Sequence, residues 1–295
     1  MRAHRVKIPT RAIRCAPDER PLSLENMTKN RVAQSLAYAG KRILWGRSGE
    51  PYDLLDQQLR FVVGTRPVRT KYRNSSNMVN RYDALQIEWL IQNIQPGAIC
   101  IDVGGHTGEC AIIMAALAKK TGQVVTFEPD PAARRVLQRN IQLNPEIGPI
   151  SVESYAISDC VGDAQLFNGK GNANSALAAV GSVTNAHPIT IKTMTLDTFL
   201  SANAFSPPNV VKIDIEGAEI HALRGARALL RSAADILVEL HPYAWGDYGV
   251  CFGDFLDVIQ AGGREAVYLD EQSPVIREPR YGTVRLIKQP TAIFA

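Results

Sequence analysis

The sequence has no long apolar run and no cysteine pair, and each absence excludes a class of protein. No apolar stretch reaches the roughly eighteen residues that a membrane-spanning helix requires, and the basic N-terminal stretch lacks the apolar centre of a signal peptide. The five cysteines are scattered without a C-x-x-C pair, so neither a zinc site nor a disulfide framework is indicated. We therefore expect a cytoplasmic protein without a membrane span.

Charges of both signs are present but unevenly distributed. Residues 1–80 carry 16 Lys and Arg against 6 Asp and Glu, whereas the rest of the chain carries 17 against 23. No aromatic residues interleave with the basic ones of residues 1–22, so we expect a solvated arm rather than a nucleic-acid contact. Apolar residues recur at near-helical spacing in residues 24–45. We predict a basic arm with a small helical cap (1–80) and a main domain (81–295), of unknown oligomeric state.

Residues 97–130 contain the clearest local pattern of the chain. An apolar strand (Ala98–Val103) leads through a glycine turn into an apolar helix (about 109–118), and a second strand (Val124–Phe127) ends on Glu128. Glycines let a ligand approach the main chain, and the helix behind them presents free N–H groups. Glu128 is placed to accept hydrogen bonds from ribose hydroxyls. The pattern predicts one βαβ half of a nucleotide-binding sheet that holds an adenosine cofactor.

The spacing of the turn selects among adenosine cofactors. Dinucleotide sites prefer G-x-G-x-x-G, whereas here Asp102 precedes Gly104, Gly105 and Gly108. A carboxylate at the entrance of the turn suits an ammonium or a sulfonium and repels a pyrophosphate. The spacing therefore favours S-adenosylmethionine over NAD and disfavours a dehydrogenase.

Strands and helices alternate along the remaining chain, which predicts a doubly wound, mostly parallel sheet with room for one antiparallel hairpin at its edge. Helices are expected at residues 81–94, 131–143, 196–200, 216–230 with a break near Gly225, and 252–261. Strands are expected at 150–156, 189–193, 210–215, 235–240, 267–269, 284–287 and 292–294. The Gly-, Asn- and Ala-rich residues 163–183 predict a loop over the site, and residues 53–66 a short helix plus a strand.

Several short strings follow one another in a recognisable order. They are DVGGHTGE, FEPDP, the asparagines Asn140 and Asn144 at a helix end, AISD (156–159), TLD (195–197), KIDIEGAE (212–219) and VELHP (238–242). Together they resemble the FkbM family of S-adenosylmethionine-dependent methyltransferases over residues 81–245. The resemblance implies an α/β class I methyltransferase (Rossmann-like) sheet of seven strands, the last one antiparallel. It also implies, usually, O-methylation of a hydroxyl on a secondary metabolite, sugar or glycan.

The resemblance has two departures. The family often has Ala and Asn where this chain has Gly105 and His106. We expect the cofactor fold to be unaffected and His106 to alter contacts to the methionine end of the cofactor.

Ligands of open α/β sheets bind outside the carboxyl ends of the strands, where this chain places several polar residues. The predicted cofactor residues are Asp102, Gly104, Gly105, His106 and Gly108 for the amino-acid part, Glu128 for the ribose, Ser158 and Asp159 for the adenine, and Asp214 near the transferable methyl group. From spacing alone, Asp159 is equally consistent with an ordinary turn acid.

Methyl transfer from a sulfonium is an in-line displacement, so the protein must align the acceptor oxygen and manage its proton. Asp214, Glu216 and His241 follow two strands and are the predicted catalytic residues. His241 is the first choice of base because a neutral imidazole accepts a proton near pH 7, and Asp214 is the second. Glu216 is equally consistent with helix capping. We predict catalysis without a metal; a magnesium or manganese ion on Asp214, Glu239 and His241 is the alternative.

Two rival functions are kept beside O-methylation. One is an N-methyltransferase, although the Asn/Asp-Pro-Pro-Tyr motif of amino methylation is absent. The other is a non-catalytic module on the same fold that binds RNA or protein through residues 1–22. A small-molecule or glycan hydroxyl is the expected partner, contacted by residues 72–78, 169–182 and 243–248.

Overall fold

The computed structural model describes residues 48–62, 65, 78–168, 175–176, 188–203, 206–271 and 277–289. The predicted arm (1–22), the helices expected at 24–45 and the strand expected at 292–294 lie outside the described residues. The chain divides into two compact units, Met1–Leu44 and Trp45–Ala295, and all that follows concerns the second. The domain boundary at residue 80 stays a prediction.

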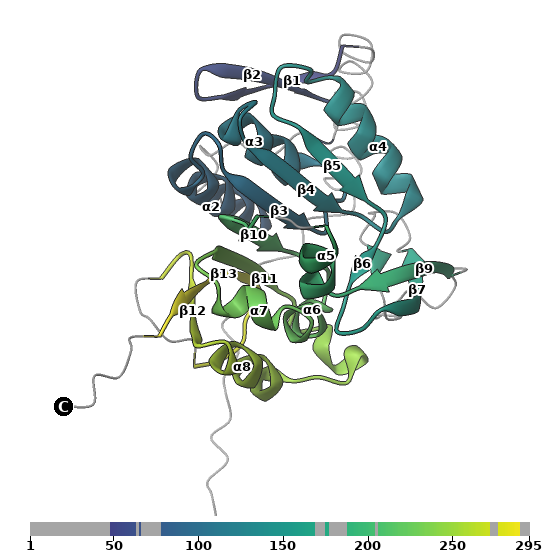
Figure 1. The fold of residues 1–295 in the computed structure, drawn as a ribbon, viewed down its shortest axis with the longest axis vertical. Coiled ribbons are helices and arrows are strands. Elements are labelled where there is room, and N and C mark those ends of the chain that lie inside the picture. Colours follow the sequence, from purple (N-terminus) through teal and green to yellow (C-terminus); the bar gives the residue numbers. More distant parts are fainter. Residues whose placement is uncertain are drawn as a thin grey trace, which may run out of the picture. The chain divides into compact units, whose positions relative to one another are not determined.

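A seven-stranded sheet forms the centre of the second unit, in the order β12-β13-β11-β10-β3-β4-β5 (Figure 1). Its strands are β3 (Ile99–Val103), β4 (Gln123–Phe127), β5 (Ile150–Glu153), β10 (Val210–Ile213), β11 (Asp235–Leu240), β12 (Arg264–Tyr268) and β13 (Gly282–Lys288). β13 is antiparallel to both its neighbours, and the other pairs are parallel. The predicted doubly wound, mostly parallel sheet with an antiparallel last strand is confirmed.

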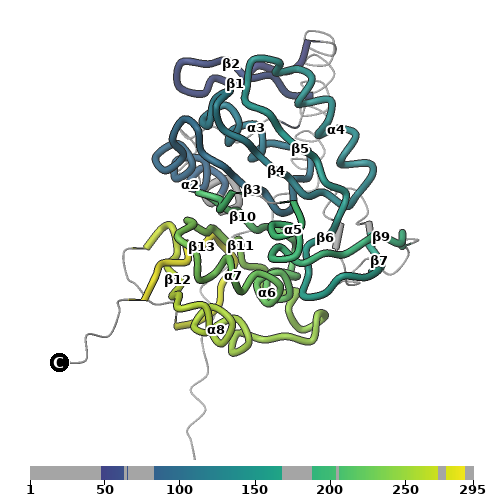
Figure 2. Tube along the Cα trace, in the orientation of Figure 1, coloured from purple at the N-terminus to yellow at the C-terminus, as the bar shows by residue number. Residues whose placement is uncertain are grey.

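Helices cover both faces of this sheet, because successive residues of a buried strand point to opposite faces. On one face, Cys100, Val124 and Val210 pack in a cluster with α2 (Met78–Asn93) and α3 (Glu109–Ala118). On the other, Ile101, Val125 and Val211 pack in a cluster with α5 (Leu196–Ala202), α6 (Glu219–Arg224), α7 (Arg227–Arg231) and α8 (Phe252–Ala261). The trace in Figure 2 passes from the blue and teal β3 and β4 at one side of the sheet to the yellow β12 at the other.

Several helix ends confirm the signals in the sequence. α3 and α8 have the predicted bounds, and α4 (Pro131–Gln142) begins at Pro131, where the side chain of Asp130 accepts a hydrogen bond of 2.7 Å from the N–H of Ala132. The helix predicted at 216–230 is broken into α6 and α7 at Gly225, where a Cβ atom would lie 2.1 Å from the carbonyl oxygen of Ser158.

Residues 50–61 form a β-hairpin, so the short helix predicted to begin at residue 53 is wrong. β1 (Glu50–Leu54) pairs antiparallel with β2 (Gln57–Phe61) around a turn at Leu55 and Asp56. Tyr52, Leu54, Leu59 and Phe61 are buried and the intervening Asp53 is exposed. Buried apolar residues therefore alternate with more exposed ones. Only a strand places every second residue on the same face.

The loop predicted for residues 163–183 is also partly wrong. Gly162–Asn168 form β7, which pairs antiparallel with β9 (Ile189–Met194), and Ser175–Ala176 form the short β8. Leu166 packs with Ile191 and Ala156 in a small cluster, while Asp163 and Gln165 face solvent. This alternation of buried and exposed residues spans too few residues to indicate a strand in a segment rich in Gly and Asn, which favours a loop. The strand predicted at 150–156 ends at Glu153, and β6 (Ala156–Ile157) pairs with β9 instead.

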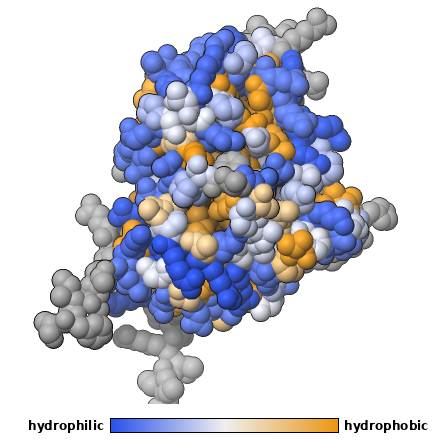
Figure 3. Space-filling model, in the orientation of Figure 1, coloured by the Kyte–Doolittle hydropathy of each residue, from blue (hydrophilic) through white to orange (hydrophobic). Residues whose placement is uncertain are grey.

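Large apolar side chains are scarce at the described surface. Leu55, Val161 and Tyr243 are the exposed ones. On the face drawn in Figure 3, hydrophobic surface gathers near the middle and hydrophilic surface surrounds it. Among the helices in the described ranges, none is both long enough and apolar enough to cross a membrane.

Candidate functional site

The glycine turn after β3 passes so close to the neighbouring strand ends that it has no room for side chains. Gly104 has φ of 88°, and a Cβ atom there would lie 1.8 Å from the carbonyl oxygen of Asp214. A Cβ atom on Gly105 would lie 2.1 Å from the hydroxyl oxygen of Thr126. Both glycine N–H groups donate to the carbonyl of Phe127, at 3.0 and 2.9 Å. The turn is thereby fixed with its backbone exposed to the cavity described below.

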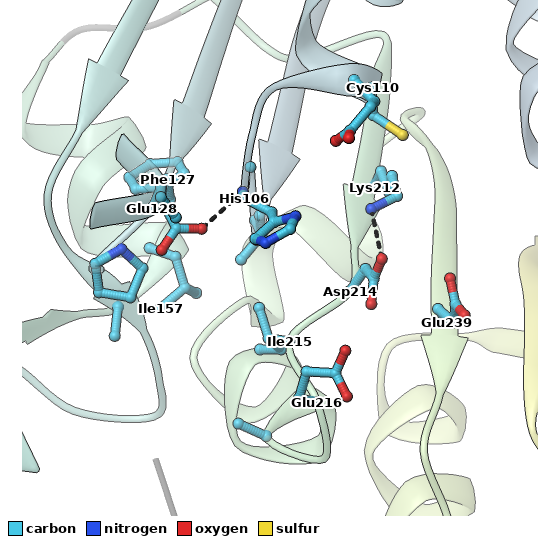
Figure 4. A pocket seen from close by; sticks show the side chains of 18 of the residues that line it. His106, Cys110, Phe127, Glu128, Ile157, Lys212, Asp214, Ile215, Glu216 and Glu239 are labelled. Carbon is cyan, nitrogen blue, oxygen red and sulfur yellow. Dashed lines mark hydrogen bonds and ion pairs between the residues drawn. The ribbon is translucent and has the colours of Figure 1, made fainter. Parts of the chain in front are cut away.

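Glu128 follows β4 and faces the same turn. One carboxylate oxygen accepts the backbone N–H of His106 and the other that of Asp130, each at 2.7 Å (Figure 4). Burial raises the pKa of Glu128 and outweighs these two hydrogen bonds, which lower it. Each oxygen keeps a lone pair, so the carboxylate can accept two further hydrogen bonds from a ligand.

A cavity of about 370 Å³ lies between these groups and the ends of β10 and β11, a size typical of small-molecule sites. It is lined by Asp83, Gln86, Ile87, Val103, Gly104, Gly105, His106, Glu109, Cys110, Ile113, Phe127, Glu128, Pro129, Ala133, Tyr155, Ala156, Ile157, Leu166, Lys212, Asp214, Ile215, Glu216, Ala218, Glu239 and Tyr281. Figure 4 shows Glu128, Phe127 and Ile157 on one side, Asp214, Lys212 and Glu239 on the other, and His106 between. One end is apolar around Glu128, and the other is acidic.

The acidic end surrounds one buried ammonium group. Lys212 Nζ lies 3.0 Å from Asp214 Oδ2 and 3.8 Å from Asp102 Oδ1. Burial alone would lower the pKa of Lys212, but these carboxylates raise it well above its usual range. Burial likewise favours a neutral Asp214, yet Lys212 and His241 hold the pKa of its carboxyl below the usual value. Lys212 therefore stays charged and keeps Asp214 ionised, as expected for a buried, paired charge.

Asp102 lies behind the cavity wall rather than in it. Its side chain is fully buried, it opposes Lys212 and Thr126 on the two neighbouring strands, and it accepts a hydrogen bond of 3.3 Å from the Thr126 hydroxyl. Burial raises the pKa of Asp102 to about 6. The structure thus places the residue as a partner of Lys212 and outside the cavity lining, and its contact with the amino-acid part of a cofactor stays a prediction. Gly108, the N-cap of α3, also lies outside the lining and packs near Leu137.

Ser158 and Asp159 are displaced from the cavity by a few residues. The Asp159 carboxylate lies 2.9 Å from Nδ1 of His221, and the Ser158 hydroxyl donates to Asp159. Tyr155, Ala156 and Ile157 line the cavity in their place. Ser158 and Asp159 lie outside the lining because β5 ends early and β6 joins a different sheet, and their contact with adenine stays a prediction.

His241 is buried beside the acidic end but is not part of the lining. Its Nδ1 atom lies 2.8 Å from Glu219 Oε1. Burial lowers the pKa of His241, but the hydrogen bond to Glu219 and the charges of Glu219, Asp214 and Glu216 raise it to about 10. An imidazolium near pH 7 is the opposite of the neutral base that the sequence predicted.

Asp83, Gln86 and Tyr281 are among the lining residues that the sequence did not predict. Asp83 and Gln86 come from the inner face of α2, and Tyr281 precedes β13. Gln86 donates to Glu239 at 2.6 Å and to Thr283 at 2.8 Å, and the Tyr281 hydroxyl also donates to Glu239. Burial raises the pKa of Glu239 to about 7 and that of Asp83 to about 6. Two polar side chains three residues apart on an apolar helix face were the available signal for Asp83 and Gln86.

Comparison with known proteins identifies the family of the chain. A model of the methyltransferase FkbM domain matches residues 102–268. The hexuronic acid methyltransferase AglP of Haloferax volcanii is 31% identical over 157 residues, which is 52% of this chain and 61% of AglP. This chain therefore spans about three fifths of the length of that curated relative.

Solved structures with a similar arrangement are more distant. The methyltransferase FkbM of Methylobacillus flagellatus has a TM-score of 0.41 and 15% identity, over 71% of this chain and 52% of that one. The putative methyltransferase SMU.1697c of Streptococcus mutans, solved in complex with SAH, has a TM-score of 0.42 and 10% identity, over 70% and 98%. The match to the domain model covers more than half of the chain and includes the glycine turn, Glu128 and the acidic strand ends. The chain is therefore a member of the FkbM methyltransferase family, with the class I methyltransferase fold and S-adenosylmethionine as its cofactor.

Proposed function

We propose that this protein methylates a hydroxyl oxygen of a sugar or glycan. The observation that carries the proposal is a single cavity with two different ends, a nucleoside-sized apolar end at Glu128 and an acidic end at Asp214. When bound, S-adenosylmethionine supplies an electrophilic methyl group on a sulfonium. The similarity to AglP, a hexuronic acid methyltransferase, supports a sugar as the acceptor.

The residues of the apolar end fit the nucleoside part of the cofactor. The Glu128 carboxylate is fixed by two backbone N–H groups and keeps lone pairs for the ribose hydroxyls. Tyr155 and Ile157 provide an apolar wall for the adenine in place of the predicted Ser158 and Asp159. Gly104 and Gly105 leave the turn open for the amino-acid part, and His106 is proposed to contact it.

The acidic end fits the sulfonium and the acceptor hydroxyl. Asp214 lines the cavity directly after β10, and Lys212 keeps it ionised. We assign the hydroxyl proton to Asp214, while the oxygen forms its bond to the methyl carbon and the carbon–sulfur bond breaks. Glu216 and Gln86 lie within the same lining and supply hydrogen bonds that hold a polyhydroxylated ring.

The cofactor half of the proposal is tested by calorimetric titration with S-adenosylhomocysteine. Wild-type protein should bind it, and Glu128→Gln should bind about tenfold or more weakly, because hydrogen bonds to a charged acceptor contribute about 1.5–3 kcal/mol. Glu146→Gln is the matched control, since Glu146 is exposed and pairs with Lys120. Equal affinity of wild type and Glu128→Gln would remove Glu128 from the site.

The transfer half is tested with isotopically labelled methyl donor and a panel of methyl glycosides, uronosides and amino sugars. Asp214→Asn should bind S-adenosylhomocysteine and lose at least about a hundredfold in turnover, as loss of a general base does. Label on an oxygen supports the proposal, and label on nitrogen favours the N-methyltransferase alternative. Turnover of Asp214→Asn at the wild-type rate would exclude Asp214 as the proton acceptor.

A further inference from the structure

Three side chains at the acidic end converge with the spacing of ligands that share one ion. One ligand atom from each of Asp214, Glu216 and His241 lies within 4.8 Å of the other two. His241 Nε2 is 3.8 Å from Asp214 Oδ1 and 3.7 Å from Glu216 Oε2. These distances are too long for hydrogen bonds. They fall between the separations of about 3.0 and 4.2 Å expected for adjacent and opposite oxygen or nitrogen ligands around an octahedral ion with bonds of about 2.1 Å.

The imidazole of His241 is held in the orientation that a metal ligand requires. Glu219 is fully buried, and its Oε2 accepts the indole N–H of Trp245 at 3.1 Å while its Oε1 lies 2.8 Å from His241 Nδ1. Nδ1 therefore donates to Glu219, and Nε2 faces the two carboxylates. A carboxylate behind a ligating histidine is how proteins fix the ring of a metal site.

The outward nitrogen of this ring lies beside two carboxylate oxygens, one of Asp214 and one of Glu216. The His241 side chain is 3% exposed, and among the described residues its Nε2 makes no hydrogen bond. The contacts of Nε2 with the two carboxylates are too long for hydrogen bonds, so the three side chains leave a position between them for a ligand that they could share.

The side chains around this position carry an excess of negative charge, which favours binding of a cation. The carboxyl groups at or beside this end of the cavity are Asp83, Asp102, Glu109, Asp214, Glu216, Glu219 and Glu239, and Lys212 is the ammonium among them. Lys212 binds Oδ2 of Asp214, while Oδ1 faces the shared position beside His241 Nε2. The two carboxylates are hard oxygen ligands that suit magnesium or manganese, and the imidazole is a borderline nitrogen ligand; none of the three is a thiolate.

We propose that Asp214, Glu216 and His241 bind one divalent cation of the magnesium or manganese type. The set differs from the one considered from the sequence, because Glu239 is turned to Gln86 and Tyr281 and Glu216 replaces it. Whether the ion binds does not depend on the proposed function. The role of the ion in catalysis does rest on the proposed function. There, an ion at the acceptor oxygen lowers the pKa of the bound hydroxyl and so assists loss of its proton.

The test is a titration with Mn²⁺, followed by the loss of the electron paramagnetic resonance signal of the free ion. Wild type should bind one Mn²⁺ per chain, and Glu216→Gln should bind at least about tenfold more weakly. Glu219→Gln, which alters only the residue behind the imidazole, should cost about 10–100-fold in affinity. Asp159→Asn is the matched control, because Asp159 and His221 form a similar pair at 2.9 Å whose second ring nitrogen is bonded to the Tyr248 carbonyl.

Two outcomes overturn the proposal. One is no binding to wild type at millimolar Mn²⁺, and the other is equal affinity of wild type and Glu216→Gln. Titration of each variant with S-adenosylhomocysteine shows whether its fold and cofactor end are intact. Protein that binds Mn²⁺ but no S-adenosylhomocysteine would contradict the proposed function and leave the cation site standing.

Discussion

Gly104 lies where β3 turns toward the cavity, and both its backbone conformation and its surroundings require a hydrogen in place of a side chain. In Gly104→Ala the new Cβ atom would meet the Asp214 carbonyl at 1.8 Å in a left-handed conformation. We expect the free energy of unfolding to fall by about 3 kcal/mol or more, measured by urea titration. Gly246→Ala is the control, because a Cβ atom there meets nothing within 4 Å. Equal losses in the two variants would mean that the close approach is not present in solution.

Glu128 gives the cofactor site a pH dependence. Burial raises the pKa of this carboxyl above its ordinary value of 4.5, so it becomes protonated at a higher pH than an exposed glutamate. A protonated carboxyl accepts fewer hydrogen bonds from the ribose. Affinity for S-adenosylhomocysteine should therefore fall as the pH is lowered, with its midpoint above pH 4.5. Calorimetry across this range should show the decline in wild type, and a profile just as steep in Glu128→Gln would contradict it.

Two asparagines of α4 connect the β1–β2 hairpin to the cofactor turn. Asn144 accepts the N–H of Arg60 at 2.8 Å and donates to its carbonyl at 2.7 Å, as a neighbouring strand would. Asn140 accepts the N–H of Val62 at 2.6 Å and donates to the carbonyl of Thr107 in the turn at 2.7 Å. The pair of asparagines therefore binds an otherwise unpaired strand edge and the site at the same time.

Removing one of these side chains should loosen the hairpin. In Asn144→Ala the partly buried N–H and C=O of Arg60 lose their partners, which should cost about 1 kcal/mol per group, because water can replace part of the lost bond. Hydrogen exchange at the amides of Arg60 and Val62 should become faster by at least about tenfold. Asn93→Ala, at an exposed helix end, is the control. Unchanged exchange at Arg60 would show that the hairpin is held by its apolar side chains alone.

The elements that the sequence predicted well are those in which a strong period coincides with a local stop signal. α8 ends at Gly262 and α4 begins after Asp130, because capping chemistry is encoded within a few residues. β7 was missed because Ala164 and Leu166, which share one face of the strand, are covered by Ile191 from a strand distant in the sequence. Asp102 was placed in the site because spacing along a strand does not reveal whether a side chain ends in front of the wall or behind it. The pairing of β7 and the position of the Asp102 side chain both depend on packing between elements that are distant in the sequence. Local sequence patterns carry no information about such packing.

At the scale of the whole molecule, a row of buried polar groups crosses the sheet beneath the cavity. Thr126, Asp102 and Lys212 oppose one another on β4, β3 and β10, and Glu239 opposes Thr283 on β11 and β13. These side chains occupy the face that α2 and α3 cover. The row places charged groups directly beneath the cavity. It lowers the stability of the fold, because buried charges contribute less to the free energy of unfolding than apolar side chains of the same size.

The charge of Asp102 should make the stability of the fold depend on pH. Its pKa in the folded protein is about 6, against 3.8 as the ordinary value, so ionisation is penalised by folding. The stabilisation contributed by the protonated carboxyl is fully present below about pH 4 and is lost as the pH rises through 6. Relative to Asp102→Asn, wild type should lose about 2 kcal/mol of unfolding free energy between about pH 4.5 and pH 7.5. Urea titrations of both proteins at each pH measure this difference, and a constant difference would contradict the raised pKa.

The hydrogen bond from Trp245 to Glu219 couples an intrinsic fluorophore to the acidic end of the cavity. The indole is buried, and its N–H is bound to the same carboxylate that orients His241. A change of charge beside His241 alters the field on that carboxylate and hence on the indole. With Trp45 and Trp89 replaced by Phe, emission from Trp245 becomes an intrinsic optical signal for events at the acidic end. Stopped-flow mixing could then time the arrival of each ligand there.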